Sequence, residues 1–289
     1  MTDIQYLVPR TLDEAIGAYA AAGSAARILA GGTDLLVQMR AGAVRPGLIV
    51  DIKNIAETTG IEQTADGGFR VGAAVSGAVL YEHPAFGKAW PGVLEALNLI
   101  GSTQVQGRAS LGGNLCNGSP AGDSVPALVA AGAIANLQGP DGSRTLAVED
   151  VPAGPGRTNL KPGEIVVSFT LPPRPAGSGD AYLRMIPRTE MDIAVVGVGV
   201  NLTIANGTCT AARVGLGAVA PTVLRVKDAE KALIGSKLDD AALDAAAAAC
   251  SAACNPIDDK RGTIAYRTKV AGVLLKRTAG IAADRARGA

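Results

Sequence analysis

The sequence is poor in the residues from which many enzymes build a catalytic site. It has a single histidine, His83, and only 3% of its 289 residues are aromatic. His83 stands before a proline in the segment YEHPAF, which favours a surface or helix-capping position. One histidine in that setting excludes a Ser-His-Asp or Cys-His catalytic arrangement.

Cysteine is also scarce. Of the four cysteines, at positions 116, 209, 250 and 254, only Cys250 and Cys254 are near neighbours, in an alanine-rich stretch that favours a helix. Two thiols without a further cysteine or histidine nearby make a poor metal site. An iron–sulfur cluster needs four such ligands. We therefore predict that Cys250 and Cys254 are buried in a helix, that Cys116 is packed, and that this chain has no metal ligands and no cluster.

The chain lacks an excess of charge of either sign and lacks long hydrophobic runs. Lys and Arg total 27 and Asp and Glu total 26, with no long block of like charge, which excludes an electrostatic nucleic-acid site. The longest apolar stretches, near 125–137 and 193–205, fall short of the ~18 residues of a membrane span. The first fifteen residues are polar and interrupted by proline, unlike a signal peptide. We expect a cytoplasmic protein.

What the sequence does have is glycine and proline, at 37 and 16 positions, with 48% hydrophobic residues. This composition indicates a turn-rich globular protein of one large domain or two ordinary ones. Near the N-terminus, Thr11 and Glu14 form a capping box that opens a helix ending at Gly23. A strand over 26–30, a helix over 34–42 and a strand over 47–52 then predict a small β-turn-α-β unit.

Beyond residue 60, strand-like and helix-like segments are mixed, until the proline-rich segment 172–179 indicates a linker. Three strands are predicted after it, over 181–186, 192–204 and 209–219, and Asn206-Gly207 is a hairpin signal between the last two. The alanine-rich remainder is predicted to be helical. The expected fold is α+β, with domains over 1–176 and 177–289.

Two segments carry a chemical signal: LAGGTDLL (29–36) and ASLGGNLCNGSPAGD (109–123). Each places a Gly-Gly pair beside small polar side chains. Successive free amides in such a turn form a concave anion site, and the N-terminus of a following helix reinforces it. Two such loops together predict a site for a pair of phosphates. Asn114, Ser119 and Asp123 add groups that can hydrogen-bond a sugar or the edge of a diphosphate.

These two segments resemble the flavin-binding medium subunits of the molybdenum hydroxylases, the family that includes carbon monoxide dehydrogenase and bacterial xanthine dehydrogenase. The resemblance extends over essentially the whole chain, including EIVVSFTLP and RTEMDIAVVGVGV. It implies a two-part FAD-binding domain of the vanillyl-alcohol-oxidase/PCMH type. A C-terminal domain of the carbon monoxide dehydrogenase flavoprotein type follows, with a three-stranded antiparallel sheet and helices.

The resemblance also implies a cofactor site. The first Gly-Gly loop cradles the FAD pyrophosphate and the second completes the cradle. Ile100 lies where some relatives place an aromatic residue against the flavin, and Val166 matches an apolar residue before the linker. Arg184 stands where some eukaryotic relatives have lysine, which leaves a lysine-specific role at the flavin edge open. The residues assigned to FAD in this way are Ala30, Gly31, Gly32, Thr33, Asp34, Leu35, Ile100, Ala109, Ser110, Gly113, Asn114, Ser119, Asp123, Val166 and Arg184.

The function implied by the resemblance is that of the FAD subunit of a heteromeric molybdenum hydroxylase. Its FAD is non-covalent, and no side chain of this chain acts as a catalytic acid or base. Electrons pass from two iron–sulfur clusters on a small partner subunit through FAD to a terminal acceptor, and a large partner subunit carries molybdopterin. The expected assembly is a dimer of heterotrimers. The alternatives are a stand-alone flavin oxidase or dehydrogenase and a non-redox nucleotide-binding module. Substrate and terminal acceptor stay open.

Overall fold

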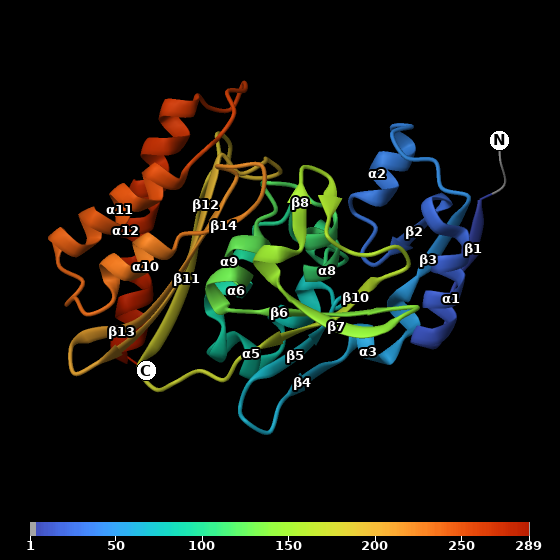
Figure 1. Cartoon of the computed structure of the whole chain (residues 1–289), viewed down its shortest axis with the longest axis horizontal. Coiled ribbons are helices and arrows are strands. Elements are labelled where there is room, and N and C mark those ends of the chain that lie inside the picture. Colours follow the sequence, from blue (N-terminus) through green and yellow to red (C-terminus); the bar gives the residue numbers. More distant parts are fainter. Residues whose placement is uncertain (1–3, 289) are drawn as a thin grey trace.

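The computed structural model describes residues 4–288 as a mixed α/β molecule. Figure 1 shows the N-terminal elements at one end of the long axis and the C-terminal helices at the other, with the rest of the chain between them. Within residues 4–288, no helix is both long and apolar enough to cross a membrane. The described part excludes residue 289 and residues 1–3, with which the polar N-terminal segment begins.

The chain begins with a small parallel sheet, as the β-turn-α-β pattern predicts. Thr11 caps the first helix by accepting a hydrogen bond from the amide of Glu14 (3.2 Å), and Gly23 ends that helix with a positive φ of 53°. The elements are β1 (Gln5–Leu7), α1 (Leu12–Ala22), β2 (Ala26–Leu29), α2 (Leu35–Arg40) and β3 (Leu48–Asp51), with the strands in the order β1-β3-β2.

An antiparallel five-stranded sheet with short helices follows, in the order β4-β5-β10-β6-β7. A hairpin turn at Pro140-Asp141 joins two of these strands. The elements are α3 (Ala56–Thr59), β4 (Ile61–Gln63), β5 (Phe69–Gly72), α4 (Gly77–Tyr81), α5 (Pro84–Ala89), α6 (Pro91–Leu97), α7 (Thr103–Gln106), α8 (Leu111–Cys116), α9 (Ser124–Ala131), β6 (Ile134–Gly139), β7 (Gly142–Ala147), β8 (Pro152–Gly154), β9 (Arg157–Thr158) and β10 (Ile165–Leu171); η1 (Gly23–Ala25), η2 (Ile52–Asn54) and η3 (Val148–Asp150) are short 3₁₀ helices.

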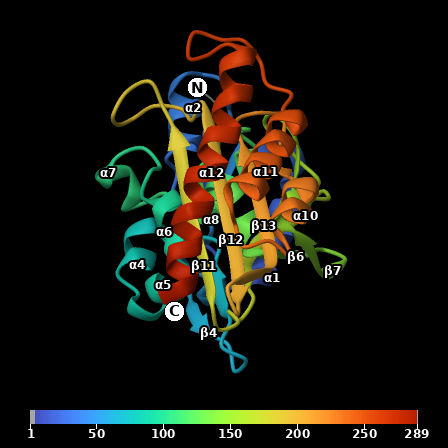
Figure 2. The ribbon, with the colours of Figure 1, turned by 90° about the vertical axis from the view of Figure 1, so that its left-hand side faces the viewer.

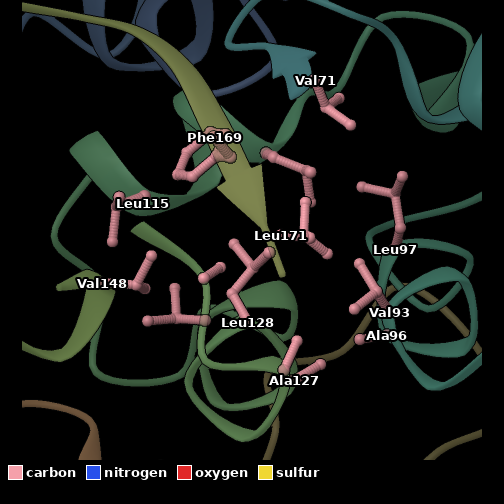
Figure 3. Packing of buried hydrophobic residues seen from close by; sticks show 14 of the residues in the cluster. Val71, Val93, Ala96, Leu97, Leu115, Ala127, Leu128, Val148, Phe169 and Leu171 are labelled. Carbon is pink, nitrogen blue, oxygen red and sulfur yellow. The ribbon is translucent and has the colours of Figure 1, made fainter. Parts of the chain in front are cut away.

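The core of this part holds together the elements that carry both glycine loops. Figure 3 shows Leu115 of α8, Leu128 of α9 and Phe169 of β10 in one cluster, and all three side chains are at most 1% exposed. Complete burial of one such side chain contributes ~1.5–3 kcal/mol to folding. The position of α8, and of the second glycine segment on it, is therefore fixed by packing against β10 and α9.

The C-terminal part is an antiparallel sheet covered on one face by three helices (Figure 2). The sheet has four strands, so the predicted number of three was wrong. The fourth has only two residues and follows Pro221, so it shows no strand periodicity. The hairpin at Asn206-Gly207 is confirmed, with φ of 51° and 76°. The elements are β11 (Ser178–Met185), β12 (Val196–Ala205), β13 (Thr208–Gly217), β14 (Leu224–Arg225), α10 (Lys227–Leu233), α11 (Asp240–Ala253) and α12 (Ile264–Gly288).

Helix α9 joins the two parts of the molecule. All of its residues are buried, because one side packs into the core of Figure 3 and another contacts β12 and β13. A β-carbon at Gly199 or Gly215 would lie 2.5 or 2.3 Å from the carbonyl oxygen of Pro126, so only glycine allows this approach. Gly199 and Gly215 are thus explained by packing against α9, whereas a β-carbon on Gly197 would meet the hydroxyl of Tyr182.

Candidate functional site

The first glycine segment forms the loop between β2 and α2, and its backbone touches the backbone of the second segment. A β-carbon on Gly31 would lie 2.0 Å from the carbonyl oxygen of Arg108 and 3.1 Å from the amide nitrogen of Ala109. These are backbone atoms, which cannot rotate away as a flexible side chain can. Glycine at position 31 is therefore required for the two loops to meet.

The amides of this loop are free to bind a ligand. No residue within 4–288 accepts a hydrogen bond from the backbone amides of Gly31, Gly32, Thr33 or Asp34. Buried or half-buried amides usually have a partner, and a run of unpaired amides at a turn is a typical anion site. The loop can therefore supply several donors to phosphate oxygens.

The second segment differs from its predicted form, because its Gly-Gly pair lies inside α8 and not in a turn that precedes a helix. Ser110 is the N-cap of α8, and its Oγ accepts a hydrogen bond from the amide of Gly113 (3.1 Å). The local reason is that Ser110 can already cap the helix, so the chain turns helical one residue before the glycines. Gly113 lies half-buried on the side of α8 that faces the first loop.

The two segments line one cavity of about 470 Å³. The predicted site residues that line it are Ala30, Gly31, Gly32, Thr33, Asp34, Leu35, Ile100, Ala109, Ser110, Gly113, Asn114 and Val166. Sequence reasoning missed the remaining lining residues, which are Tyr19, Arg27, Ile28, Gln38, Val44, Ile52, Ala73, Gly112, Cys116, Asn117, Gly156, Thr158, Leu160, Glu164 and Ile165. Proximity to the Gly-Gly pairs could have indicated Gly112, Cys116 and Asn117, but the residues from 156 to 165 carry no comparable motif.

Asn114 links the cavity to α9. Its Oδ1 accepts hydrogen bonds from the amide (3.1 Å) and the Oγ (2.7 Å) of Ser124, the first residue of α9. With its oxygen occupied in this way, the side-chain nitrogen of Asn114 stays available as a donor. The side-chain nitrogen of Asn114 can therefore donate a hydrogen bond to an anionic or hydroxyl-bearing ligand.

Three predicted site residues do not line the cavity. The Ser119 Oγ accepts a local hydrogen bond from the amide of Ala121 (3.3 Å). Asp123 and Arg184 are bound to each other (Nη1 to Oδ2, 2.7 Å), with 9% and 5% of their side chains exposed, and join α9 to β11. Tyr182 also donates its hydroxyl to Asp123 (2.9 Å). The structure therefore places this pair at the contact between the two parts of the molecule, and any contact of these three residues with a cofactor stays a prediction.

Burial controls the ionisation of the groups around the site. Burial raises the pKa of Asp123 to about 6, against the opposing effects of Arg184 and Tyr182. Burial also raises the pKa of Asp34. Cys116 lines the cavity and is exposed to solvent, although the protein atoms around its thiol raise its pKa.

The remaining candidate residues have structural positions. His83 caps α5, with its Nδ1 accepting a hydrogen bond from the amide of Phe86 (3.2 Å), as the sequence predicts. All four cysteines are free thiols. Cys250 is buried in α11 as predicted, but Cys254 is half-buried just past the end of that helix and Cys116 is exposed, so the prediction of packing was wrong for Cys116. No group of three or more His, Cys, Asp or Glu side chains within the described range 4–288 is placed to hold a metal ion.

Comparisons with known proteins agree with a dinucleotide site. Residues 2–174 match the family described as the FAD binding domain in molybdopterin dehydrogenase, and residues 181–281 match the CO dehydrogenase flavoprotein C-terminal domain. The carbon monoxide dehydrogenase medium chain of Afipia carboxidovorans is 35% identical over 98% of this chain and 97% of its own length. A putative xanthine dehydrogenase FAD-binding subunit of Escherichia coli K12 is 34% identical over 76% of each chain. The solved structure of reconstituted CO dehydrogenase from Oligotropha carboxidovorans superposes with a TM-score of 0.94, at 34% identity over 98% of each chain.

Proposed function

Because the chain belongs to the molybdopterin dehydrogenase family of FAD-binding proteins, we propose that it is the FAD-binding subunit of a heteromeric molybdenum hydroxylase. The single observation that carries the proposal is the run of free amides at 31–34, in a loop that only glycine can bring against the second segment. Unpaired amides beside a cavity fit a diphosphate, which is the most strongly charged part of FAD. The residues present therefore fit this cofactor.

Within this function, the residues of the chain bind and orient the cofactor. The amides of the first loop and the polar groups of Ser110 and Asn114 hold the diphosphate and its neighbouring hydroxyls. Ile100 and Val166 supply apolar contacts on the cavity wall. FAD, when bound, supplies the redox chemistry of its flavin ring, which the protein positions and tunes. We propose that FAD is non-covalent, because the residues that line the cavity include no histidine and a single cysteine, Cys116, which lies at the end of α8 beyond the Gly-Gly pair.

The wider assignment follows the family. One partner is a small subunit whose iron–sulfur clusters deliver electrons. The other is a large subunit with molybdopterin, where substrate is oxidised. The assembly is a dimer of heterotrimers in the cytoplasm. Carbon monoxide dehydrogenase and xanthine dehydrogenase are the relatives that support this division of labour. The FAD-binding domain, of PCMH type, comprises residues 1–176, and the C-terminal domain comprises 177–289. The family matches, which end at 174 and resume at 181, support this boundary.

Co-expression of the chain with its neighbouring genes tests this function. We expect a complex that contains FAD, iron and molybdenum, and we expect acid precipitation to leave the flavin colour in the supernatant. Size-exclusion chromatography with metal analysis makes the measurement. A lone 29.0 kDa species that oxidises a substrate without iron or molybdenum would contradict the proposal, and a yellow pellet would contradict non-covalent binding.

Gly113→Val is expected to block the cavity while the chain still folds. A β-carbon at Gly113 meets only the Oγ of Ser110, at 3.2 Å, so the added methyl groups enter the space where the cofactor binds. Valine is also a slightly better helix former than glycine, so the substitution costs α8 no helix propensity. We expect loss of FAD from the purified variant, with a melting temperature of the FAD-free chain within a few degrees of wild type. Normal FAD content in this variant would place the cofactor elsewhere.

A further inference from the structure

Behind the first glycine loop lies a hydrogen-bonded cluster of Tyr6, Asp51 and Lys53, none of which lines the cavity. The Lys53 Nζ donates to the carbonyl oxygen of Ala30 (3.0 Å) and to Asp51 Oδ1 (2.6 Å). The backbone amide of Lys53 donates to the same oxygen of Asp51 (3.0 Å), and the hydroxyl of Tyr6 donates to Asp51 Oδ2. Asp51 is only 6% exposed, so Lys53 is held at its amide and at its ammonium group by a buried carboxylate.

This contact fixes the direction of the first free amide of the loop. The peptide between Ala30 and Gly31 is trans, so its carbonyl and its N–H point to opposite sides. With the Ala30 carbonyl bound to Lys53 behind the loop, the Gly31 N–H is directed away from the cluster. Ala30 and Gly31 both line the cavity, and the Gly31 amide has no acceptor within residues 4–288.

The contact also places a positive charge next to the anion site. The Lys53 side chain is 28% exposed, so its charge is partly shielded from water by the loop. An ammonium bound to the carbonyl polarises that peptide and strengthens its N–H as a donor. The Asp51 carboxylate offsets part of this charge, but the Lys53 ammonium is bound directly to the Ala30 carbonyl of the loop as well as to Asp51.

We propose that Lys53 is a positioning residue for the diphosphate of FAD, acting through the Ala30 carbonyl to orient and polarise the loop amides. This inference rests on the proposed function. The competing explanation is that the cluster only stabilises the end of β3 and η2. The two differ in their consequences: a purely structural contact affects the stability of the FAD-free chain, whereas a positioning contact affects the affinity for a diphosphate.

Four forms of the full chain test this inference: wild type, Lys53→Met, Lys53→Arg and the control Lys269→Met. Methionine keeps an unbranched stem but loses the donor and the charge, and arginine keeps both. Lys269 is an exposed lysine of α12, in the other part of the molecule. The measurements are the FAD Kd of the FAD-free chain, its melting temperature, and the ³¹P resonances of bound FAD.

We expect Lys53→Met to weaken FAD binding about ten-fold or more, in line with the loss of a charge-assisted hydrogen bond. Its FAD-free form should melt at a lower temperature than wild type, because the buried Asp51 loses its cationic partner, but it should stay folded under the conditions of the Kd measurement. The ³¹P resonances of bound FAD should shift. Arginine should restore most of the affinity, and Lys269→Met should match wild type. An unchanged Kd in Lys53→Met, or weakened binding with unshifted ³¹P resonances and no rescue by arginine, would overturn the role of Lys53. Failure of the wild-type chain to bind FAD would instead overturn the proposed function.

Discussion

Replacement of Gly31 by alanine is expected to abolish FAD retention by the purified chain. The new methyl group would overlap the carbonyl oxygen of Arg108, 2.0 Å away, and its carbon, 2.6 Å away. Contacts below 3.0 Å with backbone atoms force the two loops apart, because backbone cannot be rearranged as a side chain rotamer can. The free amides of the first loop would then no longer share one cavity with Ser110 and Asn114. FAD released by heat from a known amount of protein measures the effect.

The matched control is Gly17→Ala in α1, where a β-carbon would meet nothing within 4 Å. Alanine is the better helix former there, so this variant should keep its FAD and gain up to ~1 kcal/mol in the free energy of unfolding. The contrast between the two substitutions separates a specific clash from a general cost of replacing glycine. Full FAD occupancy in Gly31→Ala would show that the loops can separate without loss of the site.

The first loop was predictable because its signals are local. An apolar strand, a Gly-Gly pair and a helix follow one another within fifteen residues, and each element needs only its own sequence to be recognised. The contact between Gly31 and Arg108 was not predictable in this way, since it joins segments that lie far apart in the chain. The same holds for Thr158 and Glu164, which reach the cavity from the β8–β9 hairpin and the start of β10.

Ser119 and Asp123 have neighbours that local reasoning did not predict. Both lie close in sequence to the second glycine segment, but the chain leaves the cavity after α8 and turns into α9. Asp123 is directed toward β11, where Arg184 comes from the other part of the molecule. A buried ion pair of this kind depends on the packing of two domains, and no spacing pattern in one segment encodes it.

The second large effect is expected at this ion pair. Arg184→Met should lower the free energy of unfolding by ~3–5 kcal/mol, since it leaves the buried Asp123 carboxylate without a cationic partner. The double variant Asp123→Leu, Arg184→Met should recover most of this loss, because a buried ion pair can often be replaced by apolar side chains at little cost. Urea unfolding of the wild type, the single variants and the double variant measures the coupling.

The pH dependence of the Arg184→Met variant gives a sharper test. In the wild type, the pKa of Asp123 is about 6 in the folded state, above its ordinary value of 3.8, so folding favours the neutral carboxyl. The stability linked to this group is therefore fully present below pH 3.8 and is lost as pH rises to about 6. Arg184 lowers the pKa of Asp123, so its removal raises that pKa further and extends the loss to higher pH. The gap in unfolding free energy between wild type and Arg184→Met should thus widen as pH rises above 6. A gap that stays constant between pH 6 and 8.5 would show that Arg184 does not act on the ionised form of Asp123.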